Sequence, residues 1–282
     1  MLRDVPYVPH KLEWMRAERI WPNGLRYLWT DAFGVMLYVS LCRALGEERL
    51  LEQAEQLVAD VERVLGRRRG LRIGEAPDRD GQYFHYLAMW LFALARLGEL
   101  KPEYRARGVA LARDIHPAFV IPGRGVIWKM KEDLSGPYPG YGLGAMDAFD
   151  GYVSYRTLDE EALSSEIAEM RTLIDRDWRT LDIEQDLGLG MMLWLSHFFP
   201  DEPWAKAQIR RASRTLDAMW SIHQAISAAR PGCATPSLLL PITACPWACK
   251  PQESGPSASN VSTPSSRAGA RATNMIGRRS PG

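Results

Sequence analysis

Helical segments that are apolar on every side alternate along this chain with helical segments that are apolar on one side only. A helix that is hydrophobic all round is buried, whereas a one-sided helix covers a core and faces water. The first kind comprises residues 27–45, 81–98, 146–157 and 186–199, and the second comprises residues 50–65, 102–116, 160–176 and 203–222. No long stretch has the period of a β-strand. The pattern predicts an all-α protein with four helical hairpins.

The strict order of buried helix and then one-sided helix also predicts how the hairpins are arranged. In a closed ring of hairpins, an (α/α) toroid, the inner helices are covered on all sides and the outer helices on one. An open solenoid would instead expose one face of both helices. The order therefore favours a toroid, which we place in residues 1–224.

The composition changes at about residue 224. Eight of the 19 prolines fall in the last 57 residues, among Ser, Gly, Ala and Arg, and a segment of this kind buries too little apolar surface to become ordered. We expect a disordered tail over residues 225–282. The same change has a second explanation, an altered reading frame or a truncation, and composition leaves both explanations open.

Charge and hydropathy exclude some classes of function. The net charge of +1 gives no sign of a nucleic-acid partner. The longest apolar run, Leu87 to Ala95, is far shorter than the roughly 20 residues of a membrane span, and no secretory signal is present. We expect a soluble cytoplasmic protein with no membrane partner. Because neither H-E-x-x-H nor C-x-x-C occurs, we expect no metal and no cofactor.

Each apolar segment opens on acidic residues, a glycine and, in most cases, aromatic residues. The four openings are Trp29–Gly34, Asp78–Tyr86, Asp147–Tyr152 and Glu184–Gly188. In a ring of hairpins the loops before the inner helices meet at one end, so these openings are expected to surround one cleft. The positive end of each helix dipole, about half a charge, helps to keep carboxylates ionised there.

The residue types in these openings suit carbohydrate chemistry. The acids are Asp31, Asp78, Asp80, Asp147, Asp150 and Asp186, and the aromatic neighbours are Trp29, Tyr83, Tyr86, Phe149 and Tyr152. Hydrolysis of a glycosidic bond needs one carboxyl to protonate the leaving oxygen, a second to activate water, and flat rings on which the sugar packs. The alternative for any one aspartate is a helix N-cap, where its carboxylate accepts free amides.

A histidine and a long loop add to the candidate site. His85 lies five residues after Asp80, and it is either a general acid or base or a hydrogen-bonded core histidine. The loop at residues 119–145 carries Trp128 and Lys129 and a run rich in Gly, Pro and Tyr. Such a loop is typical of binding loops, and Trp128 either contacts a sugar ring or pins the loop to the body.

These segments together resemble a known superfamily. Arg72-Ile73-Gly74, the run Asp78 to Leu87, Trp128-Lys129-Met130, Asp133-Leu134-Ser135 and the run Asp147 to Tyr152 are similar to a family of bacterial proteins within the six-hairpin glycosidase-like, (α/α) toroid proteins. The resemblance covers about residues 20–220. It implies a carbohydrate-active fold with its site in the central cleft and about four of six hairpins present, since the chain departs from the family pattern after about residue 221.

Our first hypothesis for the function is a glycoside hydrolase acting on a carbohydrate substrate. Asp80 with Asp147 or Asp150 would form the acid–base pair, and His85 would orient or protonate. The predicted substrate-binding residues, some for stacking and some for hydroxyl or carboxylate groups, are Trp29, Asp31, Arg72, Asp78, Gln82, Tyr83, Trp128, Lys129 and Tyr152.

Two alternatives remain open. In a sugar epimerase or isomerase on the same fold, His85 would be the base that moves a proton at C2. In a non-enzymatic helical binding protein, the acids would be caps and the aromatic residues core. The geometry of the carboxyls separates these hypotheses. If those of Asp80 and of Asp147 or Asp150 face one pocket about 5–10 Å apart, the hydrolase hypothesis survives; if they bond to backbone amides and point away, it fails.

Overall fold

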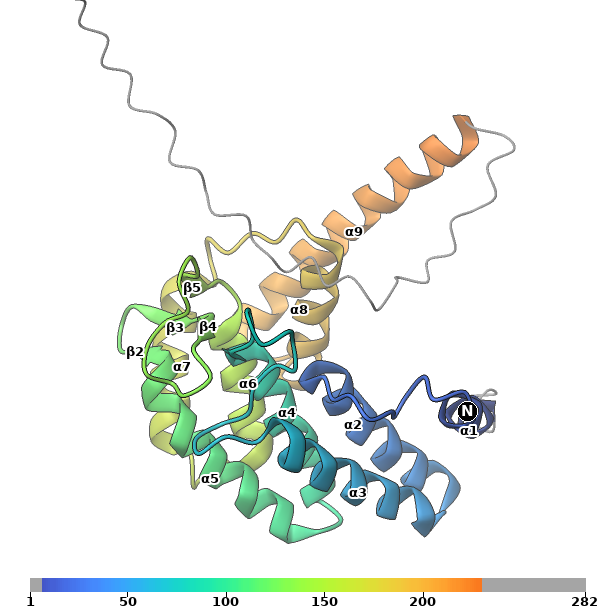
Figure 1. Cartoon of the computed structure of the whole chain (residues 1–282). Coiled ribbons are helices and arrows are strands. Elements are labelled where there is room, and N and C mark those ends of the chain that lie inside the picture. Colours follow the sequence, from blue (N-terminus) through green and yellow to red (C-terminus); the bar gives the residue numbers. More distant parts are fainter. Residues whose placement is uncertain (1–6, 230–282) are drawn as a thin grey trace, which may run out of the picture. The chain divides into compact units, whose positions relative to one another are not determined.

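Helices dominate the described part of the chain, which in this computed structural model is residues 7–229, with side chains described as far as Ser221 (Figure 1). The helices are α1 (Tyr7–Ala17), α2 (Leu28–Leu45), α3 (Glu48–Leu65), α4 (Phe84–Gly98), α5 (Pro102–Phe119), α6 (Asp147–Asp159), α7 (Ser164–Asp177), α8 (Asp186–Phe198) and α9 (Pro203–Ala229). The predicted all-α class is therefore confirmed at the level of a mostly helical protein.

Consecutive helices pack in pairs, and the first members of the pairs pack on one another. The pairs are α2 with α3, α4 with α5, α6 with α7, and α8 with α9, while contacts in the order α2–α4–α6–α8 join them. In Figure 1, α4 lies between α2 and α6. Fourteen of the 15 residues of α4 are buried, all but Arg96. This explains why the segment reads as apolar on every side.

Local signals set several helix ends. Gly46 ends α2 in the left-handed region, at φ 72°, and its N–H donates to the Cys42 carbonyl, as expected for a glycine after a helix. Pro102 starts α5, where its missing N–H costs no hydrogen bond. The residue before α6 is Met146 and the residue before α8 is Gln185, and neither makes a side-chain capping bond. Asp147 and Asp186 stand one position later, so they are not N-caps.

The region around residues 119–145 is more ordered than the irregular loop that the sequence predicts. Five short strands are described: β1 (Gln82–Tyr83), β2 (Val120–Ile121), β3 (Gly125–Ile127), β4 (Lys129–Met130) and β5 (Leu143–Gly144). They form an antiparallel β1–β4 pair and an antiparallel sheet in the order β2–β3–β5. Strands of two or three residues are too short to show a period in the sequence.

The structure also differs from the sequence prediction near both ends of the described residues, and one helix resembles a membrane span in composition. Helix α1 was not predicted, and α9 continues through residue 229, past the domain boundary placed at residue 224. The remainder of the predicted tail lies outside the described residues. Among the described residues, only α2 is long and apolar enough to cross a membrane by length and composition. That helix packs on α3 and α4, as a core helix does.

Candidate functional site

Three of the four predicted openings meet at His85, in the first turn of α4. Trp29 at the start of α2 lies with its ring centroid 5.9 Å from that of His85. Asp147, the first residue of α6, places a carboxyl oxygen 3.8 Å from the Nδ1 atom of His85. The fourth opening differs, because Asp186 is exposed and its carboxylate accepts the N–H of Leu187.

The short strands carry the loop to this point. Tyr83 in β1 pairs with Lys129 in β4, and the N–H of Phe84 donates to the Trp128 carbonyl at 3.1 Å. This register fixes Trp128 beside the first turn of α4. The two motifs Asp78–Tyr86 and Trp128–Met130, far apart in sequence, therefore form one structure.

The polar contacts of His85 involve both neighbours. The indole N–H of Trp128 donates to Nδ1 of His85 at 3.1 Å. The carboxyl oxygen of Asp147, at 3.8 Å from the same nitrogen, is beyond hydrogen-bond distance. His85 is 7% exposed and Asp147 is 4% exposed, so neither group is well screened by water.

Two buried carboxyls stand one helical turn apart on α6. Burial raises the pKa of Asp147, and the neighbouring His85 opposes part of that rise. Burial also raises the pKa of Asp150 well above its ordinary value, and the charge of Asp147 raises it further. Because a second negative charge beside the first is unfavourable, the pair favours a state in which Asp150 keeps its proton. A protonated Asp150 beside an ionised Asp147 suits a site that needs one proton donor and one proton acceptor.

Aromatic rings surround these groups. The ring centroids of Trp29 and Tyr86 are 5.0 Å apart, and those of Tyr83 and Trp128 are 5.4 Å apart. The hydroxyl groups of Tyr27 and Tyr86 are hydrogen-bonded at 2.6 Å. Aromatic faces with hydroxyl groups at their edges match the C–H faces and hydroxyls of a sugar.

Asp80 has a different role from the predicted one. Its carboxylate forms an ion pair with Arg72 at 2.6 Å and accepts the backbone N–H groups of Gly74 at 3.2 Å and Gly81 at 2.8 Å. Both oxygens are thus used in holding the loop before β1. These contacts argue against the predicted acid–base role of Asp80, and Arg72 is its ion-pair partner rather than a free sugar-binding group.

Asp31 is also structural. It is completely buried, accepts the indole N–H of Trp21 at 2.9 Å and the N–H of Tyr27 at 3.2 Å, and lies 3.5 Å from Arg26. Burial raises its pKa, and Arg26 and Trp21 oppose the rise. The predicted contact with substrate is therefore replaced by contacts that fix the start of α2.

Gln82 binds protein rather than ligand through its side-chain amide. The nitrogen donates to the carbonyls of Arg69 at 2.9 Å and Glu132 at 2.6 Å. The side chain is fully buried. Asp78 is exposed, and its carbonyl accepts the hydroxyl of Tyr138 at 3.0 Å.

Lys129 is enclosed instead of reaching over a cleft. Its side chain is 1% exposed, its ammonium donates to the Arg79 carbonyl at 2.6 Å, and Glu75 lies 3.5 Å away. Three tyrosine rings face the ammonium, with centroids 4.3–5.0 Å from it: Tyr83, Tyr138 and Tyr141. This cation–π enclosure joins the loop to β1. We refer to it as the Lys129 cage.

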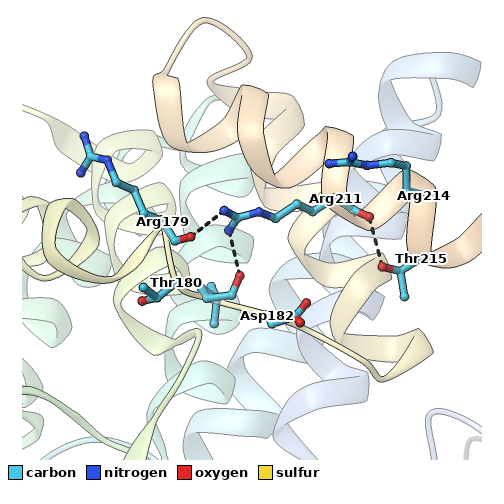
Figure 2. A pocket seen from close by; sticks show the side chains of 7 residues that line it. Arg179, Thr180, Asp182, Arg211, Arg214 and Thr215 are labelled. Atoms are coloured by element: carbon cyan, nitrogen blue, oxygen red, sulfur yellow. Dashed lines mark hydrogen bonds between the residues drawn. The ribbon is translucent and has the colours of Figure 1, made fainter.

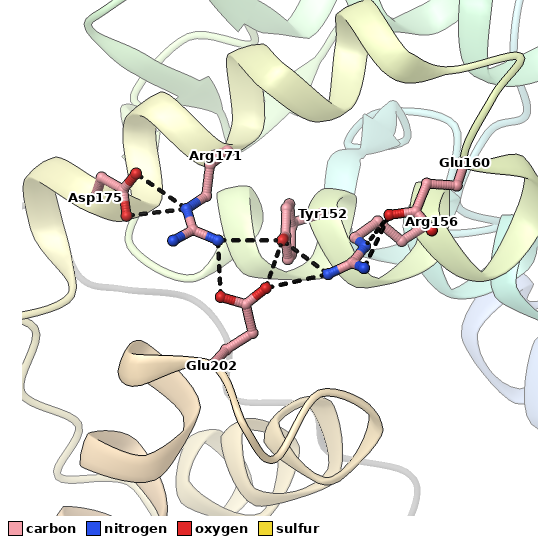
Figure 3. Close-up of polar contacts among 6 residues, drawn as sticks. All are labelled: Tyr152, Arg156, Glu160, Arg171, Asp175 and Glu202. Atoms are coloured by element: carbon pink, nitrogen blue, oxygen red, sulfur yellow. Dashed lines mark hydrogen bonds and ion pairs between the residues drawn. The ribbon is translucent and has the colours of Figure 1, made fainter.

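Tyr152 belongs to a separate polar network, shown in Figure 3. Its hydroxyl donates to Glu202 at 3.0 Å and accepts from Arg156 at 2.9 Å and Arg171 at 3.3 Å. Glu202 also pairs with both arginines. The predicted stacking of Tyr152 on a sugar is therefore not what its hydroxyl and ring contacts indicate.

Sequence reasoning missed several residues of the site. Tyr138 and Tyr141 lie in a stretch without helical period, and Tyr27 counted only as the first residue of the helical segment 27–45, so no pattern joined them to His85. Gly144 also belongs to the site, since a Cβ there would lie 1.8 Å from a carboxyl oxygen of Asp147. The signal available was the spacing of tyrosines between residues 136 and 144, which predicts aromatic contacts without naming their targets.

Two cavities occur away from His85. One of about 400 Å³ is lined by residues after α7 and by α9, among them Arg179, Arg211 and Arg214 (Figure 2). The guanidinium of Arg211 donates to the carbonyls of Arg179 at 2.5 Å and Leu181 at 3.1 Å. It therefore ties α9 to the segment that follows α7. The second, about 670 Å³, is an apolar groove lined by α2, α4 and α8.

The described residues contain no group of three or more His, Cys, Asp or Glu side chains placed to hold a metal ion. No family model and no curated protein matches the chain. The assignment of function consequently depends on the geometry around His85.

Proposed function

We propose that this chain is a carbohydrate-active enzyme of the six-hairpin, (α/α) toroid type, and that it performs acid–base chemistry at the starts of α2, α4 and α6. The order of contacts α2–α4–α6–α8 supports an inner row of helices of such a ring. A row of four inner helices, each followed by an outer one, corresponds to about four of six hairpins.

The observation that carries the proposal is the buried pair Asp147 and Asp150 beside His85. Burial and the charge of Asp147 raise the pKa of Asp150 well above its ordinary value, and a carboxyl with a raised pKa is suited to donate a proton to the leaving oxygen of a glycoside. Asp147 is the group whose ionised form is assisted by His85. Trp29, Tyr83 and Trp128 provide faces for a sugar ring. We therefore assign glycoside hydrolysis, with Asp147 and Asp150 replacing the pair that included Asp80.

One observation favours a second candidate, a sugar epimerase or isomerase. The carboxyl of Asp147 lies 3.8 Å from Nδ1 of His85, and a histidine with a carboxylate behind it is suited to remove a proton next to a sugar carbonyl. In that reaction His85 is the base, and the product is an isomer of the substrate instead of two shorter sugars.

The test is an assay of the full chain against a panel of oligosaccharides and free sugars. Hydrolysis is read from new reducing ends, and isomerisation from solvent deuterium incorporated at C2. We expect Asp150→Asn to lower kcat by about 10²- to 10⁴-fold, with the circular dichroism spectrum unchanged. Asp201→Asn is the control, because that side chain is fully exposed.

The two reactions respond differently to substitution. Hydrolysis depends on Asp150 more than on His85, whereas isomerisation is abolished by His85→Gln. Binding of sugars without any turnover would support the non-enzymatic alternative. Turnover that survives both Asp147→Asn and Asp150→Asn would overturn the proposal.

A further inference from the structure

Nδ1 of His85 has two neighbours that make opposite demands on it. The Trp128 indole nitrogen, 3.1 Å away, carries a hydrogen and can only donate a hydrogen bond. The Asp147 carboxyl, 3.8 Å away, is an acceptor when ionised. The indole therefore requires an unprotonated Nδ1, and the carboxylate favours a protonated one.

The indole bond itself requires a lone pair on Nδ1. The Nε1–H group of Trp128 donates to Nδ1 at 3.1 Å, and an imidazole nitrogen that carries a hydrogen has no lone pair with which to accept. While this bond exists, neutral His85 carries its hydrogen on Nε2.

That tautomer matters for proton transfer. An imidazole with its hydrogen on Nε2 has no lone pair on Nε2 with which to accept a proton. If the hydrogen stands on Nδ1 and is held by Asp147, Nε2 becomes a base, as in other histidine–carboxylate pairs. The two neighbours thus correspond to two functional states of one side chain.

We propose that Trp128 is a positioning residue that holds resting His85 in the Nε2–H tautomer. When substrate displaces the indole, the Nδ1–H tautomer, whose hydrogen Asp147 accepts, becomes the favoured one. Trp128 stands between β3 and β4, and its side chain is 9% exposed. The functional consequence rests on the proposed acid–base role of His85, whereas the tautomer itself does not.

The experiment is NMR spectroscopy of the full chain with ¹⁵N-labelled histidine and tryptophan, at a pH where His85 is neutral. Shifts of the two ring nitrogens report which one carries the hydrogen, and the signal lost in His85→Gln assigns the spectrum. We expect Nε2 to carry the hydrogen and a coupling to pass through the hydrogen bond between Trp128 Nε1 and His85 Nδ1. A hydrogen on Nδ1 in the wild-type protein would overturn the proposal.

Variants then test whether Trp128 and Asp147 compete for Nδ1 of His85. Trp128→Phe removes the donor and is expected to move the hydrogen to Nδ1, and the added change Asp147→Ala is expected to reverse part of that shift. The matched control is Trp29→Phe, because Trp29 also contacts the His85 ring, edge to face at 5.9 Å, and should leave the tautomer unchanged. An unchanged tautomer in a folded Trp128→Phe protein contradicts the proposal.

The result separates this inference from the proposed function. An Nε2–H tautomer in a protein that turns over no sugar leaves the inference standing and removes the function. If the protein does process sugars but His85 carries its hydrogen on Nδ1 at rest, the proposed function stands and this inference is wrong.

Discussion

At the scale of single residues, the aspartates of the helix openings divide into two groups by their partners. Asp31 and Asp80 are surrounded by donors, namely arginines, backbone N–H groups and an indole. Burial raises the pKa of Asp31, Asp147 and Asp150 alike, but Arg26 and Trp21 oppose the rise for Asp31, His85 opposes it for Asp147, and the charge of Asp147 adds to it for Asp150. Compensated carboxylates stabilise a fold, whereas uncompensated ones are typical of sites that move protons.

Asp80→Asn tests the structural assignment. Asparagine keeps the shape but removes the charge facing Arg72, so we expect a loss of about 3 kcal/mol in the free energy of unfolding. Urea unfolding measures it, with the exposed Asp78→Asn as a control that should change stability by less than about 0.5 kcal/mol. An Asp80→Asn protein of wild-type stability would show that the ion pair contributes nothing.

Asp150 predicts a pH dependence of stability. Its folded pKa lies above the unfolded value of about 3.9. The carboxyl therefore contributes most to stability below about pH 4, and that contribution is lost as pH rises towards the folded pKa. Asp150→Asn has no such loss, so its stability relative to the wild type should increase from pH 4 to pH 8. Urea unfolding of the wild type and of Asp150→Asn at several pH values between 4 and 8 measures the difference.

At the scale of elements, the hairpin α8–α9 is joined to the rest by a few specific contacts. Glu202, just before α9, connects it to Arg156 of α6 and Arg171 of α7. Gln208 of α9 donates to the Trp178 carbonyl after α7 at 3.0 Å. Polar bonds at the ends of helices thus add to the apolar packing of α8 against α6.

Glu202→Gln should loosen this hairpin selectively. The loss of two ion pairs and a charged acceptor for Tyr152 is expected to lower stability by about 2 kcal/mol. Hydrogen exchange should become faster in α8 and α9 and remain unchanged in α4. Asp201→Asn, next in sequence and exposed, is the matched control, and equal acceleration throughout the protein would contradict a local role.

The approach of β5 to α6 predicts the effect of a single methyl group. Gly144→Ala would place its Cβ 2.4 Å from the carboxyl carbon of Asp147, and relief of this overlap should cost about 1–3 kcal/mol. Thermal unfolding measures the change. Gly142→Ala is the control, since nothing lies within 4 Å of its Cβ; similar losses in both variants would rule out the contact with Asp147.

Periodicity located the long helices well because burial acts on every residue of a helix. The predicted starts of α2, α8 and α9 fall within one residue of the observed ones. The site was predicted less completely, for a physical reason. His85, Asp147 and Trp128 were identified from their places at helix openings, but the partners of Asp80 and Lys129 depend on the register of two-residue strands. Sequence spacing does not encode that register.

At the scale of the whole described unit, the apolar groove lies along the proposed inner row. Phe33 of α2, Phe92 of α4 and Trp194 of α8 line it, and Phe33 is 38% exposed. Helices α2 and α8 are the first and the last of that row. An exposed apolar lining at this place agrees with the proposal of an inner face that further helices would cover in a six-hairpin ring.

The Lys129 cage has a practical consequence. Its buried amine and the exposed amine of Lys131, which directly follows β4, are the same chemical group only two residues apart. An amine-reactive reagent should label Lys131 at the rate of a free lysine and Lys129 only when β1 and β4 separate. The ratio of the two labelling rates, measured by mass spectrometry, therefore reports how often β1 and β4 separate beside His85.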